Sequence, residues 1–418
     1  MTPIQKELPQ LVAHNVISAQ TAADIERYYA NKKVPESNIL LSVFGVLGSV
    51  LVGLGIILIF AHNWDDFSRV TKTLLAFLPL VVFQGLTAYT LIAKKSNVWK
   101  EAAGTLLFFA VGSSIALVAQ IYNIPGNMGS FLCTWVVLCL PLIYLLRSNA
   151  LAVLHLVLAT WYGVEVGYDN DTQPYLYLLL LALFIPFYYR LIKQQAGSNI
   201  TAVMHWLVPL SAIIVFGGFV NDYYRFTALL YMAFFCLLYA IGKLPYFSHY
   251  RRTGYTGFGE VGILVLLFTG TFLDFWKGVT YQNIYPSIGL VVVFTAFTAA
   301  GIYLALRSKK SLKETDWILW AGFVFPVLFL CALANTGMAT VLGNLVVLAL
   351  GCIIIKQGVD SLNFRSLNFG LVIVSALTIC RFFDTDMSFA IRGLLFLAVG
   401  AGFFTANYIV ARKKRSNP

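Results

Sequence analysis

An uncharged apolar run at residues 39–61 constrains this chain more than any other feature. It is 23 residues long and ends abruptly in the polar stretch His62-Asn63-Trp64-Asp65-Asp66. About 20 apolar residues in an α-helix are enough to cross the hydrocarbon core of a bilayer. The run therefore predicts a membrane-spanning helix that is followed by a polar turn at the membrane surface.

The same pattern repeats to the end of the chain. Hydrophobic residues make up 59% of the 418 residues and charged residues only 11%, whereas about a quarter of the residues in soluble domains are charged. The apolar runs predict an all-α fold, a polytopic transmembrane helical bundle of about 14 spans. The predicted spans start near Ile39, Thr71, Glu101, Ser130, Asn149, Pro174, Ile200, Arg225, Gly257, Tyr285, Asp316, Met338, Leu367 and Ser388.

The chain divides into three predicted segments. Residues 1–38 carry apolar positions at helical spacing around Leu8 and Ile25, which predicts a short cytoplasmic helical hairpin. Residues 39–411 form the transmembrane helical domain, and residues 412–418 are a basic cytoplasmic tail. The hairpin is either a cap that packs on the membrane domain or a docking site for a protein partner.

Basic residues give the expected orientation. With the N-terminus in the cytoplasm, 23 of the 29 Lys and Arg residues fall on the inner side, as the positive-inside rule requires. The six on the outer side are Arg69, Lys72, Arg225, Lys277, Arg381 and Arg392. Both termini are therefore predicted to be cytoplasmic. The net charge of +11 is explained by this topology, so no nucleic-acid partner is expected.

No signature of catalysis or of cofactor binding is present. The six cysteines fall in apolar runs without a C-x-x-C pair, which favours neither disulfides nor a zinc site. The chain also contains no H-E-x-x-H, no G-x-S-x-G and no P-loop. The sequence thus favours a protein that is not an enzyme, and no cofactor or metal is expected.

Three polar clusters fall on the predicted outer side. Their amides, carboxylates, arginines and aromatic rings together predict a polar vestibule for a small solute or a lipid head group. Its residues are His62, Asn63, Trp64, Asp65, Asp66, Arg69, Gln120, Tyr122, Asn123, Arg381, Asp384 and Arg392. The alternative for the first cluster is an interfacial tryptophan anchor beside a turn, and Arg381 with Asp384 has the spacing of a local ion pair.

Four ionisable residues fall within the predicted spans, where charge is costly. Glu101 and Glu260 come near the inner ends of the third and ninth spans, where a helix N-terminus favours a carboxylate. His155 and His205 lie deeper, and they are either proton relays or hydrogen-bonded structural residues. All four are candidates for intramembrane polar sites.

Several motifs together resemble a known family. They are Ala61-His62-Asn63-Trp64 after a glycine-rich first span, Ala119-Gln120-Ile121-Tyr122, Arg381-Phe382-Phe383-Asp384 and the N-terminal hairpin. The chain is similar in these features to bacterial polytopic membrane proteins known as domain of unknown function 2157. The resemblance is clearest over about the first 130 residues and at the last hairpin. It implies a location in the bacterial cytoplasmic membrane, with several spans, but no activity or substrate.

Two classes of function fit the sequence. Many spans, short loops and scattered intramembrane polar groups favour a transporter or an envelope-lipid-handling protein, with membrane lipids as its surroundings. The alternative is a membrane scaffold or sensor that binds a partner through residues 1–38. A transporter keeps its activity without that hairpin, whereas a scaffold loses its partner.

Overall fold

The computed structural model describes residues 3–14, 16–31, 39–62, 67–169, 172–220, 225–247, 249–250, 252–280, 287–308, 316–384, 393–394, 397, 400–405, 407–409 and 412. All regular elements within these residues are helices, which confirms the predicted all-α class. Ten of the helices are long and apolar enough to cross a membrane, or up to eleven if one bent pair counts as a single span. Val43–Gly55 and Thr227–Gly242 are shorter apolar helical stretches. The described residues thus support fewer spans than the predicted number of about 14.

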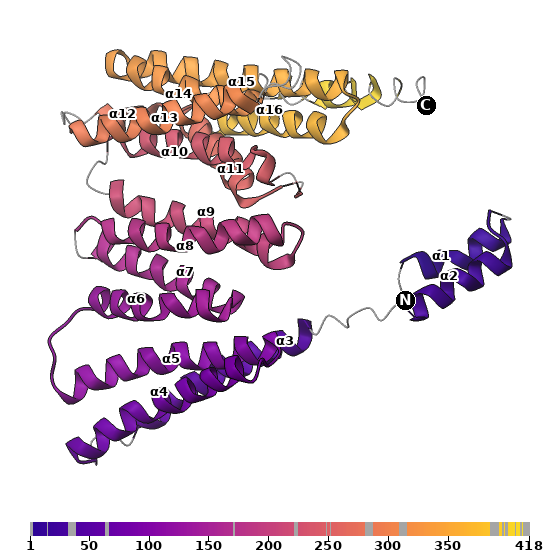
Figure 1. The fold of residues 1–418 in the computed structure, drawn as a ribbon. Coiled ribbons are helices and arrows are strands. Elements are labelled where there is room, and N and C mark those ends of the chain that lie inside the picture. The colour runs from indigo at the N-terminus through magenta and orange to yellow at the C-terminus, as the bar shows by residue number, and fades with distance from the viewer. Residues whose placement is uncertain are drawn as a thin grey trace. The chain divides into compact units, whose positions relative to one another are not determined.

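The chain forms two compact units, of which the first comprises residues 1–126 and 137–152. Its helices are α1 (Pro3–Ala13), α2 (Ala19–Asn31), α3 (Ile39–His62), α4 (Arg69–Ile92), α5 (Asn97–Ile121), the second part of α6 (Met128–Leu146) and the start of α7 (Asn149–Val164). Helix α5 packs against both α3 and α4, and α1 contacts α2 (Figure 1). Helix α6 ends at Leu146 and α7 begins at Asn149, so Arg147 and Ser148 form the short loop that the sequence predicts there.

Side-chain hydroxyls join α4 to α5. Ser114 donates to the carbonyl oxygen of Ala76 at 2.7 Å, and Thr87 donates to that of Ala103 at 3.3 Å. Both hydroxyls are buried. Since lipid offers no hydrogen-bond partners, small hydroxylated residues are well suited to such contacts between helices.

The second unit comprises residues 127–136 and 153–418. After α7 it contains the π-helix η1 (Glu165–Asp169), α8 (Tyr175–Gln194), α9 (Asn199–Val220), α10 (Thr227–Gly242), the 3-10 turn η3 (Pro245–Phe247), α11 (Gly254–Thr269), α12 (Leu273–Thr280), α13 (Ile288–Ser308), α14 (Trp317–Ala334), α15 (Thr336–Asp360) and α16 (Phe364–Asp384). Helix α10 contacts α11, α13 and α14, while α15 contacts α14 and α16 (Figure 1).

Local sequence signals set several helix boundaries in this unit. Thr253 and Thr256 form a reciprocal capping box at the start of α11. Asn335 caps α15 by accepting a hydrogen bond from the Met338 N–H at 3.0 Å. These side chains satisfy N–H groups that have no partner within the helix. After α15, Leu362 has a φ of 52°, a left-handed conformation that ends the helix without a glycine.

Glycines allow α15 and α16 to approach closely. A Cβ atom added to Gly370 would lie 2.7 Å from the Ile355 nitrogen and 2.9 Å from the Gly351 oxygen. A Cβ on Gly358 would meet the backbone of Leu367 even more closely. Small residues at such contacts let two backbones pack closely, and this packing is one of the forces that associate helices in a membrane.

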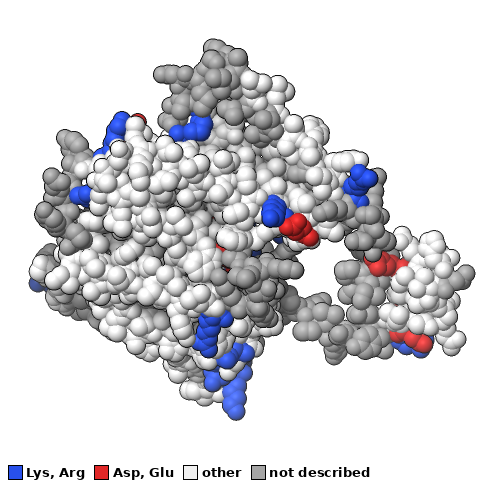
Figure 2. Space-filling view, turned by 90° about the horizontal axis from the view of Figure 1, so that it is seen from above, with Lys and Arg blue, Asp and Glu red and all other residues white. Residues whose placement is uncertain are grey.

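The surface is largely apolar. Figure 2 shows few charged groups on a face made mostly of other residues. Large aliphatic side chains are exposed along the helices, among them Leu74 at 68% and Leu330 at 65%. Apolar side chains on this scale are unfavourable in water and find their natural surroundings in lipid.

Candidate functional site

The ninth predicted span is broken. Helix α11 ends at Thr269, α12 begins at Leu273, and the two helices are bent by 89°. The sequence predicts one span starting near Gly257, and the structure instead divides this segment in two. A break frees backbone groups that a continuous helix would pair, so it is tolerated at membrane depth only where protein groups satisfy them.

Side chains from two helices satisfy the backbone at this break. The Trp276 indole donates to the carbonyl oxygen of Gly270 at 2.7 Å, and the Asn344 amide donates to that of Thr271 at 3.0 Å. Thr271 and Trp276 are fully buried, each at 0% exposure. A Cβ atom on Gly343 would lie 2.5 Å from the Gly270 oxygen, so α15 presses directly on the break. The break is thus supported by packing as well as by hydrogen bonds.

Arg381, from the last turn of α16, lies at the same break. Its Nη2 atom donates to the Thr271 hydroxyl at 3.3 Å, and its guanidinium lies 4.5 Å from the centre of the Phe272 ring. The contact with the ring is a cation–π interaction, which holds a charge against an apolar surface. Arg381 is therefore a residue of the predicted vestibule that lies at the break between α11 and α12.

A polar cavity of about 910 Å³ opens at one end of the same helix α11. The start of α11, the start of α14, the start of α16 and the ends of α10 and α15 line it. Its volume is in the range of pockets that bind small molecules. All five helices belong to the second unit.

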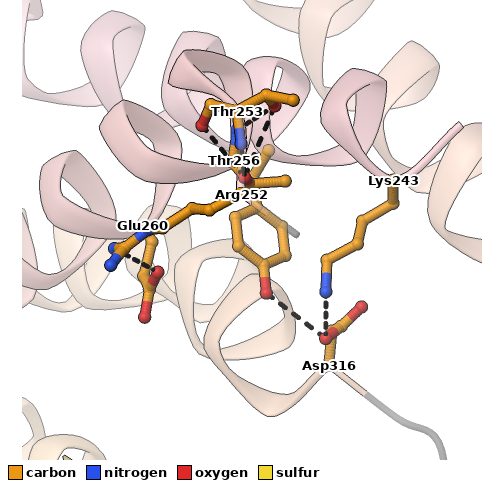
Figure 3. Close-up of polar contacts among 7 residues, drawn as sticks. Lys243, Arg252, Thr253, Thr256, Glu260 and Asp316 are labelled. Carbon is orange, nitrogen blue, oxygen red and sulfur yellow. Dashed lines mark hydrogen bonds and ion pairs between the residues drawn. The ribbon is translucent and has the colours of Figure 1, made fainter. Parts of the chain in front are cut away.

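Two ion pairs fix the cavity wall (Figure 3). Lys243 Nζ lies 3.0 Å from Asp316 Oδ1, which also accepts from the Tyr239 hydroxyl at 3.3 Å. Arg252 Nη2 lies 2.7 Å from Glu260 Oε2. Asp316 precedes α14, and its side chain makes no cap hydrogen bond with that helix, because the carboxylate is turned to Lys243 and Tyr239. Asp316 therefore joins the start of α14 to the end of α10, and Glu260 holds α11 to the residues just before it.

Of the predicted intramembrane residues, Glu260 is the one that lines this cavity. From the sequence, Lys243 and Arg252 count only among the 23 basic residues of the predicted inner side, and Asp316 only marks the start of a predicted span. The sequence does hold a sign that these residues could meet, because all three fall at the ends of predicted spans on the same side of the membrane. Asn344 and Trp276 were also missed, although an amide within the apolar run of α15 requires a partner inside the protein.

Glu101 has a capping role in the first unit. Its carboxylate accepts hydrogen bonds from the Asn149 N–H at 2.8 Å, from the Ala150 N–H at 3.0 Å and from the Ser148 hydroxyl. These groups form the first turn of α7 and the residue before it. A carboxylate is favoured there because the N-terminus of a helix is its positive end. The geometry places Glu101 at the N-terminus of a neighbouring helix and not of its own.

Replacing Glu101 by alanine is expected to lower the free energy of unfolding by about 2 to 3 kcal/mol, because three donors lose a charged acceptor. Glutamine at this position keeps one acceptor oxygen, so its effect should be about half as large. Unfolding in mixed detergent, monitored by circular dichroism, measures the loss of stability in both variants. Glu26→Ala on the exposed surface of α2 is the control, and an equal loss there would refute the capping role.

The two histidines are buried among aromatic rings. His205, at 1% exposure, has its Nδ1 atom 2.5 Å from the Tyr188 hydroxyl and packs against Phe247. His155, also at 1%, has its Nε2 atom 3.4 Å from the Leu180 carbonyl oxygen and stacks on Phe184. Neither histidine lines the polar cavity.

The residues of the predicted outer vestibule are divided between the two units. In the first unit, the Tyr122 hydroxyl lies 3.1 Å from the Thr73 hydroxyl, which links the end of α5 to the start of α4. Arg69, Gln120 and Asn123 are close to these two residues in the sequence, and all three are exposed. Asn63, Trp64, Asp65, Asp66 and Arg392, and the side chains of His62 and Asp384, lie outside the described residues. The vestibule as a whole stays a prediction.

Apolar helices of spanning length, an apolar surface and a broken helix with buried partners together define a polytopic membrane protein. Comparison with protein families agrees. Residues 9–152 match the family described as predicted membrane protein (DUF2157), which is the family that the sequence motifs resemble. The match begins within α1 and ends within the first turn of α7. Searches of curated proteins and of solved structures found no match.

Proposed function

We propose that this protein is a transporter or an envelope-lipid-handling protein of the bacterial cytoplasmic membrane, with about 14 spans and both termini inside. The observation that carries the proposal is the break between α11 and α12, with its 89° bend. Discontinuous helices recur in secondary transporters, where the unwound segment contributes to the substrate path.

The partners of the break support this proposal. A bend needed only to turn the chain at the membrane surface would be solvated by water or lipid head groups. Here Thr271 is fully buried, and Asn344 of α15 and Arg381 of α16 both reach it. Three helices are thus coupled at one irregular backbone segment, so a movement of α11 must change contacts with α15 and α16.

The two ends of α11 also differ in a way that fits alternating access. Its first turns line the polar cavity through Thr253, Thr256 and Glu260, and its last residue adjoins the break at Gly270. The 16 residues of α11 extend over about 24 Å. By the predicted topology the cavity faces the cytoplasm and Arg381 faces the outside. One short helix would therefore connect the polar cavity on the predicted inner side to the buried break on the predicted outer side.

Transport by the purified protein in sealed vesicles tests the proposal. We expect movement of at least one member of a panel of organic ions, sugars and fluorescent phospholipids. Asn344→Leu should slow that movement about tenfold, because it removes the amide that holds the Thr271 carbonyl. Gln84→Leu, at an exposed position of α4, is the matched control and should transport normally.

If no solute or lipid moves, the proposal is wrong. Deletion of residues 1–33 then examines the scaffold alternative, because a docking hairpin would lose a co-purifying protein on deletion. A transporter would instead keep its rate without these residues.

A further inference from the structure

The polar cavity of the second unit has an uneven charge balance. Three cations line it, Lys243, Arg252 and Arg365, with two carboxylates, Glu260 and Asp316. Each carboxylate is already engaged, Asp316 by Lys243 at 3.0 Å and Glu260 by Arg252 at 2.7 Å. The lining therefore keeps one positive charge in excess.

Arg365 supplies this excess charge. It belongs to the first turn of α16, and its side chain is exposed. Among the described residues, its guanidinium forms no ion pair, and its backbone N–H donates to the Asn363 side-chain oxygen at 3.0 Å. A guanidinium has five donors in a planar fork that matches carboxylate and phosphate oxygens. It is the cation at this cavity best placed to accept a new anion.

Helix ends add to the positive potential. Helices α11, α14 and α16 begin at the cavity, while α10 and α15 end there. Each N-terminus contributes about half a positive charge and each C-terminus about half a negative charge. At α14 the Asp316 side chain makes no cap bond. The first N–H groups of this helix, on lining residues Trp317 and Ile318, thus have no cap from Asp316.

The lining also has an apolar and aromatic part, beside uncharged polar residues such as Gln357, Asn363 and Ser366. Phe247, Trp317, Ile354 and Phe369 all contribute to the wall beside the charged groups. A cavity of about 910 Å³ is much larger than an inorganic anion needs. Its chemistry suits a molecule with one anionic group and an apolar body.

We propose that this cavity binds the phosphate or carboxylate group of an amphipathic organic anion, with Arg365 as the principal contact and the apolar wall receiving its body. The proposal rests on the proposed function and names its substrate class. A soluble organic anion and an anionic lipid head group share this chemistry.

Calorimetric titration of the full chain in an uncharged detergent tests the proposal, with hexyl phosphate as the probe. We expect the wild type to bind hexyl phosphate, and Arg365→Gln to weaken binding about tenfold through loss of a charged hydrogen bond. Asp316→Asn should act in the opposite direction and tighten binding, because it raises the excess positive charge. A purely structural ion-pair network would not produce these opposite changes.

Lys356→Gln is the matched control, since Lys356 is an exposed cation on α15 that does not line the cavity. The proposal is overturned if the wild type does not bind, if Lys356→Gln weakens binding as much as Arg365→Gln does, or if hexyltrimethylammonium binds in preference. Because Arg365 is exposed, its replacement should leave the thermal unfolding temperature unchanged, which confirms that the variant is folded.

Nanodiscs of phosphatidylcholine, with and without phosphatidate, separate the two sources of the anion. Loss of hexyl phosphate binding when phosphatidate is present identifies a lipid head group, and unchanged binding identifies a soluble anion. The vesicle assay stays independent of these titrations. Transport that Arg365→Gln leaves intact rejects this site alone, whereas binding without any transport rejects the transport proposal alone.

Discussion

Replacing Trp276 by alanine is expected to lower the free energy of unfolding by about 3 to 5 kcal/mol, the range for large aromatic side chains in a core. Trp276 is at 0% exposure, packs against Phe325 and donates its indole N–H to the Gly270 carbonyl oxygen at 2.7 Å. Alanine would leave both a cavity and an unpaired carbonyl at the break between α11 and α12. Unfolding in mixed detergent, followed by circular dichroism, measures the loss.

Two further variants separate the contribution of the indole hydrogen bond from that of the buried ring. Trp276→Phe keeps an aromatic ring but removes the donor, so it should cost only about 1 to 3 kcal/mol. Trp161→Ala removes a tryptophan that is 48% exposed on α7 and should change stability by less than about 0.5 kcal/mol. A loss at Trp276 no greater than that at Trp161 would show that the break does not depend on this side chain.

Replacing Gly370 by leucine should destabilise the pair α15 and α16 by about 3 kcal/mol or more. A Cβ atom alone would lie 2.7 Å from the Ile355 nitrogen, so a leucine side chain requires the helices to separate. Backbone atoms cannot move aside as a flexible side chain can. The same unfolding measurement detects the effect.

Gly289→Leu is the control for this prediction. A Cβ atom on Gly289, in α13, would meet nothing within 4 Å. Leucine also favours a helix over glycine by roughly 1 kcal/mol, so this control should be neutral or slightly stabilising. Opposite signs at the two glycines would show that close packing, and not helix propensity, decides the result at Gly370. Equal signs would contradict the packing argument.

Much of the local structure could be predicted from the residues. The run at residues 39–61 predicts a helix, and α3 extends over Ile39–His62. The short loop before Asn149 is also where α6 and α7 separate. These predictions succeed because each helix pairs its backbone groups internally, so hydropathy and loop residues are enough to locate it.

The break in the ninth span was not predicted. Residues 269–272 read Thr-Gly-Thr-Phe, which is compatible with an apolar helix that continues. The bend depends on Asn344 and Arg381, which are more than 70 positions away in the sequence. A single sequence carries no information on which distant side chain will meet a given carbonyl group.

In the candidate site, too, the sequence predicts some residues and only the packing of distant helices reveals the others. Glu260 could be singled out because a carboxylate near a predicted span is costly. Lys243 and Asp316 are 73 positions apart, and each alone looks like an ordinary loop charge. Their pairing beside Arg252 and Glu260 becomes visible only when α10, α11 and α14 are packed together.

By itself, the sequence determined that this chain is a bundle of apolar helices in a membrane, because in lipid every backbone hydrogen bond must be made within the protein. It also identified the family whose model matches residues 9–152. Only the tertiary structure decided where a helix breaks, which carboxylate caps which helix and which charges share a cavity. These features arise from contacts between distant segments, and their energies depend on burial and geometry that no local pattern specifies.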